Sequence, residues 1–157
     1  MENKKNLEVL DVRLAYDAKK ISDDDFLMSM KDIKRFKKWF NFYPFIWITS
    51  KNSKLFEGAV LQMKGGFVIP IFFNFDIVIT EIGHNNINGK ISGKFEGIAE
   101  IETTTINGVT HFRKTLTVWS ENKRAVKSYT RGAKIFHCPY VKWRANKFVK
   151  KWASKNT

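Results

Sequence analysis

The last stretch of the chain, residues 128–154, limits the possible folds most, because it is the longest segment with one helical periodicity. At about 100° per residue, its apolar side chains fall in one sector roughly 100° wide. These side chains are Cys138, Val141, Ala145, Phe148, Val149 and Trp152. Lys147, Lys150 and Lys151 point away from that sector. The helix therefore has one face that must be buried against another layer of structure.

Two starting points are open for this helix. Pro139 lacks an amide hydrogen and suits a first helical turn. A helix that begins there leaves residues 131–138 as an entry segment, with His137 at a cap position. A helix that begins near Ser128 instead places His137 on a helix face.

Composition favours one globular domain over residues 1–157. The hydrophobic share is 43% and the aromatic share 15%, which is enough for a sizeable core. Cys138 is the single cysteine, so no internal disulfide can form, and no zinc spacing is present. Residues 1–12 lack the apolar run of a signal peptide, and the most apolar stretch, 67–79, is too short to span a bilayer. We expect a soluble, cytoplasmic protein.

The formal net charge of +13 invites comparison with proteins that bind nucleic acids or anionic membranes. Most of the 28 basic residues are lysines spread along the chain, and arginine-rich clusters are absent. This distribution favours a solvated basic surface. A nucleic-acid partner is therefore not expected, whereas peripheral contact with a membrane stays open.

The first forty residues predict a strand followed by two short helices. Residues 7–16 alternate as a strand does. Ser22 then caps a helix, because its hydroxyl can accept from a free amide and residues 23–25 are all Asp at the positive end of the helix dipole. Capping explains this acidic run better than a metal site. Apolar residues at helical spacing continue to Phe40, with a break near Asp32.

The middle of the chain predicts a run of antiparallel strands. We expect them at residues 45–49, 55–64, 71–82, 87–92 and 94–106, and in the stretch from Val109 to Trp119. Asn107-Gly108 is the strongest local signal, because both residues accept the positive φ that a type I′ hairpin turn requires. This turn determines which residues of the two strands face each other. On the apolar face the pairs are Thr103 with Phe112, Ile101 with Lys114, Ala99 with Leu116 and Gly97 with Val118. On the solvent-facing side they are Glu102 with Arg113 and Glu96 with Trp119. Glu102 and Arg113 should form a cross-strand ion pair.

Lys114 is the one charged residue on the apolar face of this hairpin. Such a lysine either extends to the sheet edge or meets an acidic group or a ligand inside a cavity. Glu81 has the same strand parity as Ile77 and Ile79, which makes it the most plausible internal partner.

The order of elements and several short motifs resemble a known superfamily. The motifs that support this resemblance are FKKWF followed by a Pro-containing loop, the strand from Gly97 to NGVT, the strand ending in TLTVW, and FHCPYVKWRANKFVKKW. In the last motif, His137, Val141, Trp143 and Phe148 match the spacing of the family's helix positions. The chain is similar to the START-related, Bet v 1-like (SRPBCC) superfamily, in particular its small polyketide cyclase/dehydrase-like members, and the likeness covers nearly the whole length.

The resemblance implies an α+β helix-grip fold. A curved antiparallel sheet of about seven strands would wrap around the long C-terminal helix, with two short helices between the first and second strands. It also implies a hydrophobic cavity between sheet and helix, used in this superfamily for lipids, sterols, polyketides, hormones or quinones. Side chains that we expect to line it are Phe45, Trp47, Phe73, Phe75, Phe95, Phe112, Lys114, Leu116, Tyr140 and Trp143. Alternatively, these large rings fill the space and leave no pocket.

Signals for catalysis are weak. His84 falls on a turn and His111 on the outer face of a strand, and neither has a carboxylate or cysteine at a diagnostic spacing. Candidates for acid–base chemistry around a cavity are Lys114, Glu81, His137 and Tyr140. No cofactor and no metal ion is predicted.

Three functions from different classes follow. We expect a carrier or sensor that binds a hydrophobic small molecule or lipid in the cavity. The alternatives are a cyclase or dehydratase that acts on a polyketide-like or aromatic substrate, and a basic surface module that binds RNA or an anionic membrane. The sequence does not indicate an oligomeric state.

Overall fold

The computed structural model describes residues 6–42, 46–65 and 73–155, and the side chain of Phe73 lies outside this description. Twelve helices and strands are formed within these ranges. In chain order they are β1 (Asn6–Asp17), α1 (Asp23–Met28), α2 (Ile33–Phe40), β2 (Ile46–Thr49), β3 (Val60–Gly65), β4 (Phe73–Ile82), β5 (Asn86–Gly93), β6 (Glu96–Ile106), β7 (Val109–Ser120), α3 (Lys123–Gly132), the π-helical turn η1 (Ala133–His137) and α4 (Cys138–Ala153).

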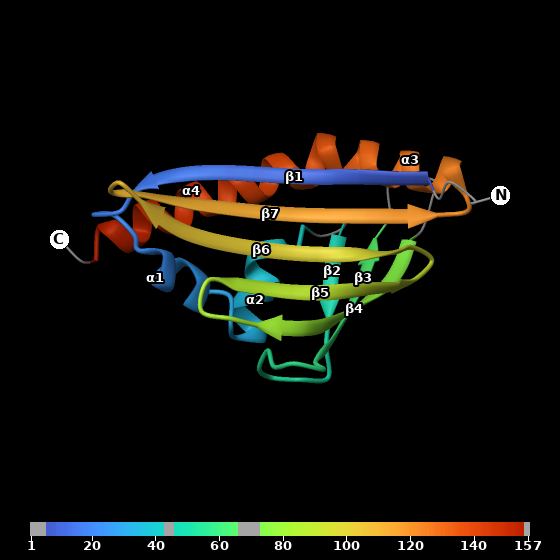
Figure 1. The fold of residues 1–157 in the computed structure, drawn as a ribbon, viewed down its shortest axis with the longest axis horizontal. Helices are drawn as coiled ribbons and strands as arrows, with labels where there is room; N and C mark the ends of the chain where they lie inside the picture. Colours follow the sequence, from blue (N-terminus) through green and yellow to red (C-terminus); the bar gives the residue numbers. More distant parts are fainter. Residues whose placement is uncertain (1–5, 43–45, 66–72, 156–157) are drawn as a thin grey trace.

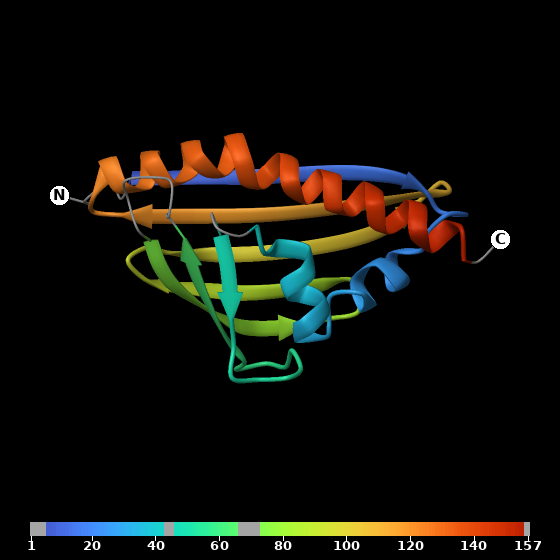
Figure 2. The ribbon, with the colours of Figure 1, turned by 180° about the vertical axis from the view of Figure 1, so that it is seen from behind.

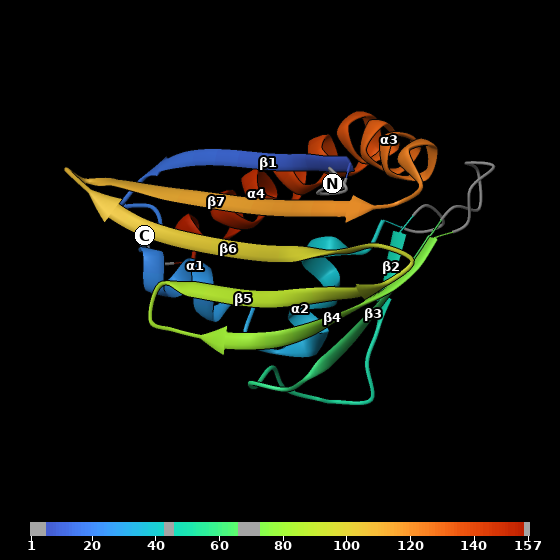
Figure 3. The same cartoon turned by 45° about the vertical axis from the view of Figure 1, so that its right-hand side comes forward.

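The strands form one antiparallel sheet in the order β1-β7-β6-β5-β4-β3-β2 (Figure 1). Its twist turns β2 and β3 steeply against the long strands β1, β7 and β6 (Figure 3). All helices cover the same face. Seen from that side, α3, η1 and α4 run across β1 and β7, while α1 and α2 lie beside the lower half of the sheet (Figure 2). The predicted architecture of curved sheet, two short helices and long C-terminal helix is confirmed.

The hairpin of β6 and β7 forms as its turn residues require. Asn107 and Gly108 have φ values of 51° and 77°, the left-handed values that a type I′ turn needs. Every strand pair predicted from this turn is present, including Ile101 with Lys114. One predicted ion pair is wrong: Arg113 donates to Asp11 of β1, on its other side, with Nε 3.2 Å from Oδ1. Because β7 lies between β1 and β6, carboxylates on both strands are within reach of Arg113, and the one it contacts is Asp11 of β1.

The two short helices begin at the predicted caps. The Ser22 hydroxyl accepts from the amide of Asp25, and the Asp32 carboxylate accepts from the amide of Arg35. The break near Asp32 separates α1 from α2, and the apolar side of α2 is buried.

The C-terminal helix is longer than the sequence predicted. It starts at Lys123, where the Asn122 side chain accepts from the amide of Ala125, and it continues through η1 into α4. Pro139 lies in the first turn of α4, so His137 occupies the cap position of that segment. Inside this helix the predicted inner face is correct: Val141, Ala145 and Val149 are buried.

Two aromatic clusters fill opposite ends of the space under the sheet. At one end Phe26 packs on Phe112, with ring centroids 4.9 Å apart, and contacts Trp39 and Phe148. At the other end Phe75, Phe95 and Tyr129 contact one another, with centroids 5.1–6.0 Å apart. Between the clusters, the walls are mainly aliphatic.

The close approach of β6 to β7 at Gly97 can be tested by substitution. A Cβ atom on Gly97 would lie 2.0 Å from the backbone oxygen of Thr117. We expect Gly97→Ala to lower the free energy of unfolding by about 1–3 kcal/mol, as overpacking does. Gly108→Ala, which meets no atom within 4 Å but keeps a positive φ, should cost about 1–2 kcal/mol. Urea denaturation of both variants measures this, and an unchanged midpoint for Gly97→Ala would contradict the packing.

Candidate functional site

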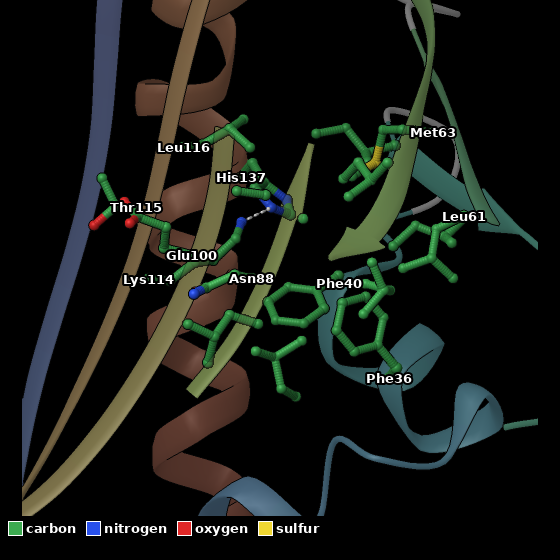
Figure 4. Close-up of a pocket in the computed structure, with 18 of the residues that line it drawn as sticks. Phe36, Phe40, Leu61, Met63, Asn88, Glu100, Lys114, Thr115, Leu116 and His137 are labelled. Atoms are coloured by element: carbon green, nitrogen blue, oxygen red, sulfur yellow. Dashed lines mark hydrogen bonds between the residues drawn. The ribbon is translucent and has the colours of Figure 1, made fainter. Parts of the chain in front are cut away.

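A small cavity lies between the inner face of the sheet, helix α2 and the C-terminal helix (Figure 4). Its volume is about 40 Å³. Apolar side chains from both sides form most of the wall. The polar residues around it are Lys114, His137, Asn88, Glu100 and Thr115, and Lys114 and His137 contact each other. The apolar members are Phe36, Phe40, Ile46, Ile48, Leu61, Met63, Ile77, Ile79, Ile87, Ala99, Ile101 and Leu116, and Tyr129 also contributes.

Lys114 and His137 form one polar pair in this wall. The Lys114 Nζ atom lies 3.0 Å from His137 Nε2, the contact drawn as a dashed line in Figure 4. The ammonium also lies 4.8 Å from the centroid of the Phe40 ring. His137 is 3% exposed, and its second ring nitrogen, Nδ1, has no hydrogen-bond partner among the described residues. Strand β7 supplies one member of the pair, and the C-terminal helix supplies the other.

The apolar surroundings shift the pKa of both groups downward. Burial lowers the pKa of Lys114 from 10.5 to about 8, because a cation loses its hydration inside the wall. Burial, and then the charge of Lys114, hold the pKa of His137 well below its usual value of 6.5. At neutral pH the pair therefore carries one positive charge, on the ammonium of Lys114. The imidazole of His137 is neutral and accepts a hydrogen bond from this ammonium through Nε2. The imidazole hydrogen must then lie on Nδ1.

The π-helical turn η1 explains why His137 faces the sheet. Ala133, His137, Val141 and Ala145 are all buried and follow at intervals of four residues. In a regular α-helix this spacing drifts by about 40° per step and leaves the buried face. η1 ends at His137, so the wider π turn offsets the drift between Ala133 and His137 and keeps both side chains on the buried face.

The structure brings only some of the predicted lining residues to the cavity. Lys114 and Leu116 lie on its wall, and so does the acid–base candidate His137. Phe75, Phe95 and Phe112 face inward but belong to the two packed aromatic clusters. Phe45 and the side chain of Phe73 lie outside the described residues.

Three predicted aromatic residues lie outside the cavity. Trp47 alternates with the inward-facing Ile46 and Ile48 and so points to the outer face of β2. Tyr140 stacks on Phe42, with centroids 4.5 Å apart, and Trp143 is 51% exposed. Both residues lie on the side of α4 opposite to its buried stripe.

Glu81 is not the internal partner of Lys114. A β-bulge between Ile79 and Glu81 shifts the pairing of β4 with β5 by one residue, which reverses the strand parity on which the prediction depended. The Glu81 carboxylate is exposed and accepts from the Asn88 side chain at 2.7 Å. It therefore cannot act on a molecule in the cavity.

Several wall residues were missed at the sequence level. Phe36 and Phe40 of α2 form one side of the cavity, and the inward residues of β2 and β3 form the other. The alternation Ile46-Trp47-Ile48 carried the signal for β2, since the two isoleucines share a face. The contact between His137 and Lys114 had no signal in the sequence.

The described residues hold no group of three or more His, Cys, Asp or Glu side chains that could bind a metal ion. Among the helices described, none combines the length and the apolar character that crossing a membrane requires.

Comparisons with known proteins agree on the architecture. No protein-family model and no curated protein matches the chain in sequence. Solved structures do match over nearly the whole chain. The chain has the helix-grip fold. It is similar to Ara h 8.0201, with a TM-score of 0.60 and 8% identity, over 92% of this chain and 99% of the other.

Two further structures show the same likeness. Ginseng major latex-like protein 151 from Panax ginseng matches with a TM-score of 0.60 and 12% identity, over 90% of this chain and 97% of the other. Protein Ms6760 from Mycobacterium smegmatis matches with a TM-score of 0.62 and 11% identity, over 91% of both chains. At these identities the likeness supports a Bet v 1-like helix-grip fold and carries no information on the ligand.

The buried imidazole predicts how stability depends on pH. Because the folded-state pKa of His137 is depressed, the unfolded chain takes up a proton below about pH 6.5 that the folded chain does not. The free energy of unfolding should therefore fall as pH drops from 7 to 5. His137→Gln, which keeps a neutral acceptor for Lys114, should flatten this dependence. Urea denaturation at both pH values measures the slope, with His111→Gln as the exposed control; equal slopes for His137→Gln and wild type would contradict the assignment.

Proposed function

We propose that this helix-grip protein binds a small, mostly apolar molecule in the cavity between its sheet and its C-terminal helix, as a carrier or sensor. The observation that carries the proposal is a mostly apolar wall that contains a polar pair, Lys114 and His137, whose side chains contact each other. Small-molecule sites have this composition, since apolar walls supply affinity and a few polar groups fix the orientation.

The volume of the cavity limits the ligand. About 40 Å³ is far below the roughly 300–1,000 Å³ of sites for drug-sized ligands. A ligand must therefore be small, or side chains must move as it enters. Met63 is an unbranched wall residue with three rotatable bonds, which suits it to such movement. The same flexibility would let one site accept related molecules of different length.

The pair could also serve an enzyme of the cyclase or dehydratase kind, the alternative that the resemblance to polyketide cyclase-like proteins suggests. A donor and an acceptor 3.0 Å apart meet the distance requirement for proton transfer. A carrier differs from such an enzyme in one respect: it returns its ligand unchanged. Native mass spectrometry of the purified protein, followed by organic extraction, would identify a bound molecule, and incubation with that molecule would show turnover or its absence.

Filling the cavity should abolish binding. Leu116→Phe adds a ring at the wall, and we expect an apolar fluorescent probe to bind at least tenfold more weakly than it does to wild type. Thr117→Phe, the neighbouring position on the outer face of β7, is the matched control and should leave probe affinity unchanged. Fluorescence titration gives both affinities, and circular dichroism confirms that the fold persists. Unchanged probe binding to Leu116→Phe would place the probe elsewhere.

A second candidate function rests on the exposed side of the C-terminal helix. Phe136, Tyr140, Trp143 and Lys147 follow one another at helical spacing on the side opposite to the buried stripe. Trp143 is 51% exposed, and the Lys147 ammonium lies 5.1 Å from its ring. Exposed aromatic rings among lysines are typical of surfaces that dock on anionic membranes, where the rings enter the headgroup region. RNA binding has no comparable support.

Vesicle binding tests this second candidate. We expect the protein to co-sediment with vesicles that contain phosphatidylserine, and to do so less at high salt, because the attraction is electrostatic. Trp143→Ala should reduce the bound fraction severalfold at constant charge. Trp47→Ala, an aromatic residue on the outer face of the sheet, is the control. Equal binding to vesicles of phosphatidylcholine alone would contradict an electrostatic contact.

A further inference from the structure

Lys114 is half-buried, and its ammonium in the cavity wall makes fewer hydrogen bonds than it has N–H donors. An ammonium has three N–H donors, and one of them meets His137 Nε2. Among the described residues, no other hydrogen bond and no ion pair to a carboxylate involves Nζ. A desolvated charge without a counterion is unfavourable in an apolar wall. The empty protein therefore presents a cation with unused donors.

The carboxylates near β7 do not supply the missing charge. Glu100 and Glu102 flank Ile101 in β6. Glu102 is exposed, whereas Glu100 is half-buried and belongs to the residues around the cavity. Neither carboxylate forms an ion pair with Lys114 among the described residues. The exposed Glu81 carboxylate accepts a hydrogen bond from Asn88 and is not among the residues that line the cavity. Lys114 also does not extend to a sheet edge, because β1 covers β7 on that side and Nζ turns toward His137. The ammonium is thus directed inward, toward the space that a ligand would occupy.

We propose that the ligand is a monocarboxylic acid with a short aliphatic or aromatic body, and that its carboxylate pairs with Lys114. This inference rests on the proposed function of the cavity. One ammonium with two unused N–H donors matches one negative charge on two acceptor oxygens. A phosphate monoester brings close to two charges and a third acceptor oxygen, for which the neutral His137 offers no second cation.

The remaining wall fits the body of such a molecule. Beyond the polar pair, the cavity is bounded by Phe40, Ile46, Ile48 and Met63, which offer contact to carbon and no hydrogen bond from their side chains. Figure 4 shows Met63 on the far side of the cavity from Lys114, while the Phe40 ring lies beside the ammonium, with its centroid 4.8 Å from Nζ. A ligand with its carboxylate at Lys114 would direct its apolar part toward these side chains.

Matched pairs of ligands test the proposal with the intact chain. Calorimetric titrations would compare hexanoate with 1-hexanol, and benzoate with benzyl alcohol. We expect each carboxylate to bind wild-type protein at least tenfold more tightly than its alcohol. Lys114→Met, which replaces the cation by an apolar chain of similar length, should abolish this preference while the alcohols still bind. Lys90→Met, an exposed lysine on β5, is the matched control and should keep it.

The outcomes separate the two proposals. Alcohols that bind wild type as tightly as carboxylates, or a preference that survives in Lys114→Met, would overturn the carboxylate inference and leave the apolar cavity in place. Tighter binding of hexyl phosphate than of hexanoate would also overturn it. If neither acids nor alcohols bind, the proposed function fails together with the inference. A melting temperature for Lys114→Met at or above that of wild type shows that the variant is folded.

Discussion

The burial of one helix face in the concave side of the sheet is the constraint on which the rest of this structure depends. Val141, Ala145 and Val149 are almost fully buried there, and each of the two valine side chains contributes about 1.5–3 kcal/mol when it leaves water. Ala145 has no bulk beyond Cβ, which allows the helix to approach the strands closely. Helix α2 is tied to this helix, since the Arg144 side chain donates to the backbone oxygen of Lys38. The position of α4 thus sets the depth of the space that α2 closes.

The aromatic residues hold this space open by packing at its ends. Phe26 and Phe112 contact each other at one end, and Phe95 and Tyr129 do so at the other. Rings that are already in contact with one another are not free to line a large pocket. The expectation of a cavity surrounded by aromatic rings and the alternative of a filled core are therefore each correct for part of the space. The cavity survives only in the middle, between aliphatic strand residues and Phe40.

How far the sequence could predict these features depends on the range of the interactions that determine them. The register of β6 and β7 followed from Asn107 and Gly108, because turn chemistry acts between neighbours, and this register placed Lys114 on the inner face. The prediction that Glu81 faces inward was wrong because a β-bulge precedes it, and no residue type in β4 indicates that bulge. The contact of His137 with Lys114 joins the π turn η1 to β7 across the core, and the residues around His137 do not indicate a partner so far away in the sequence. Local rules therefore located one partner of the pair, and only the tertiary structure located the other.

The two partners also differ in how they are held. Lys114 lies in β7, which is hydrogen-bonded to strands on both sides, so its backbone position is fixed independently of any ligand. His137 lies in the π turn η1 of the C-terminal helix, which packs on the sheet through its side chains. In the empty protein the imidazole partly satisfies a cation that would otherwise be isolated, and this explains how an apolar wall can contain a lysine without losing the fold.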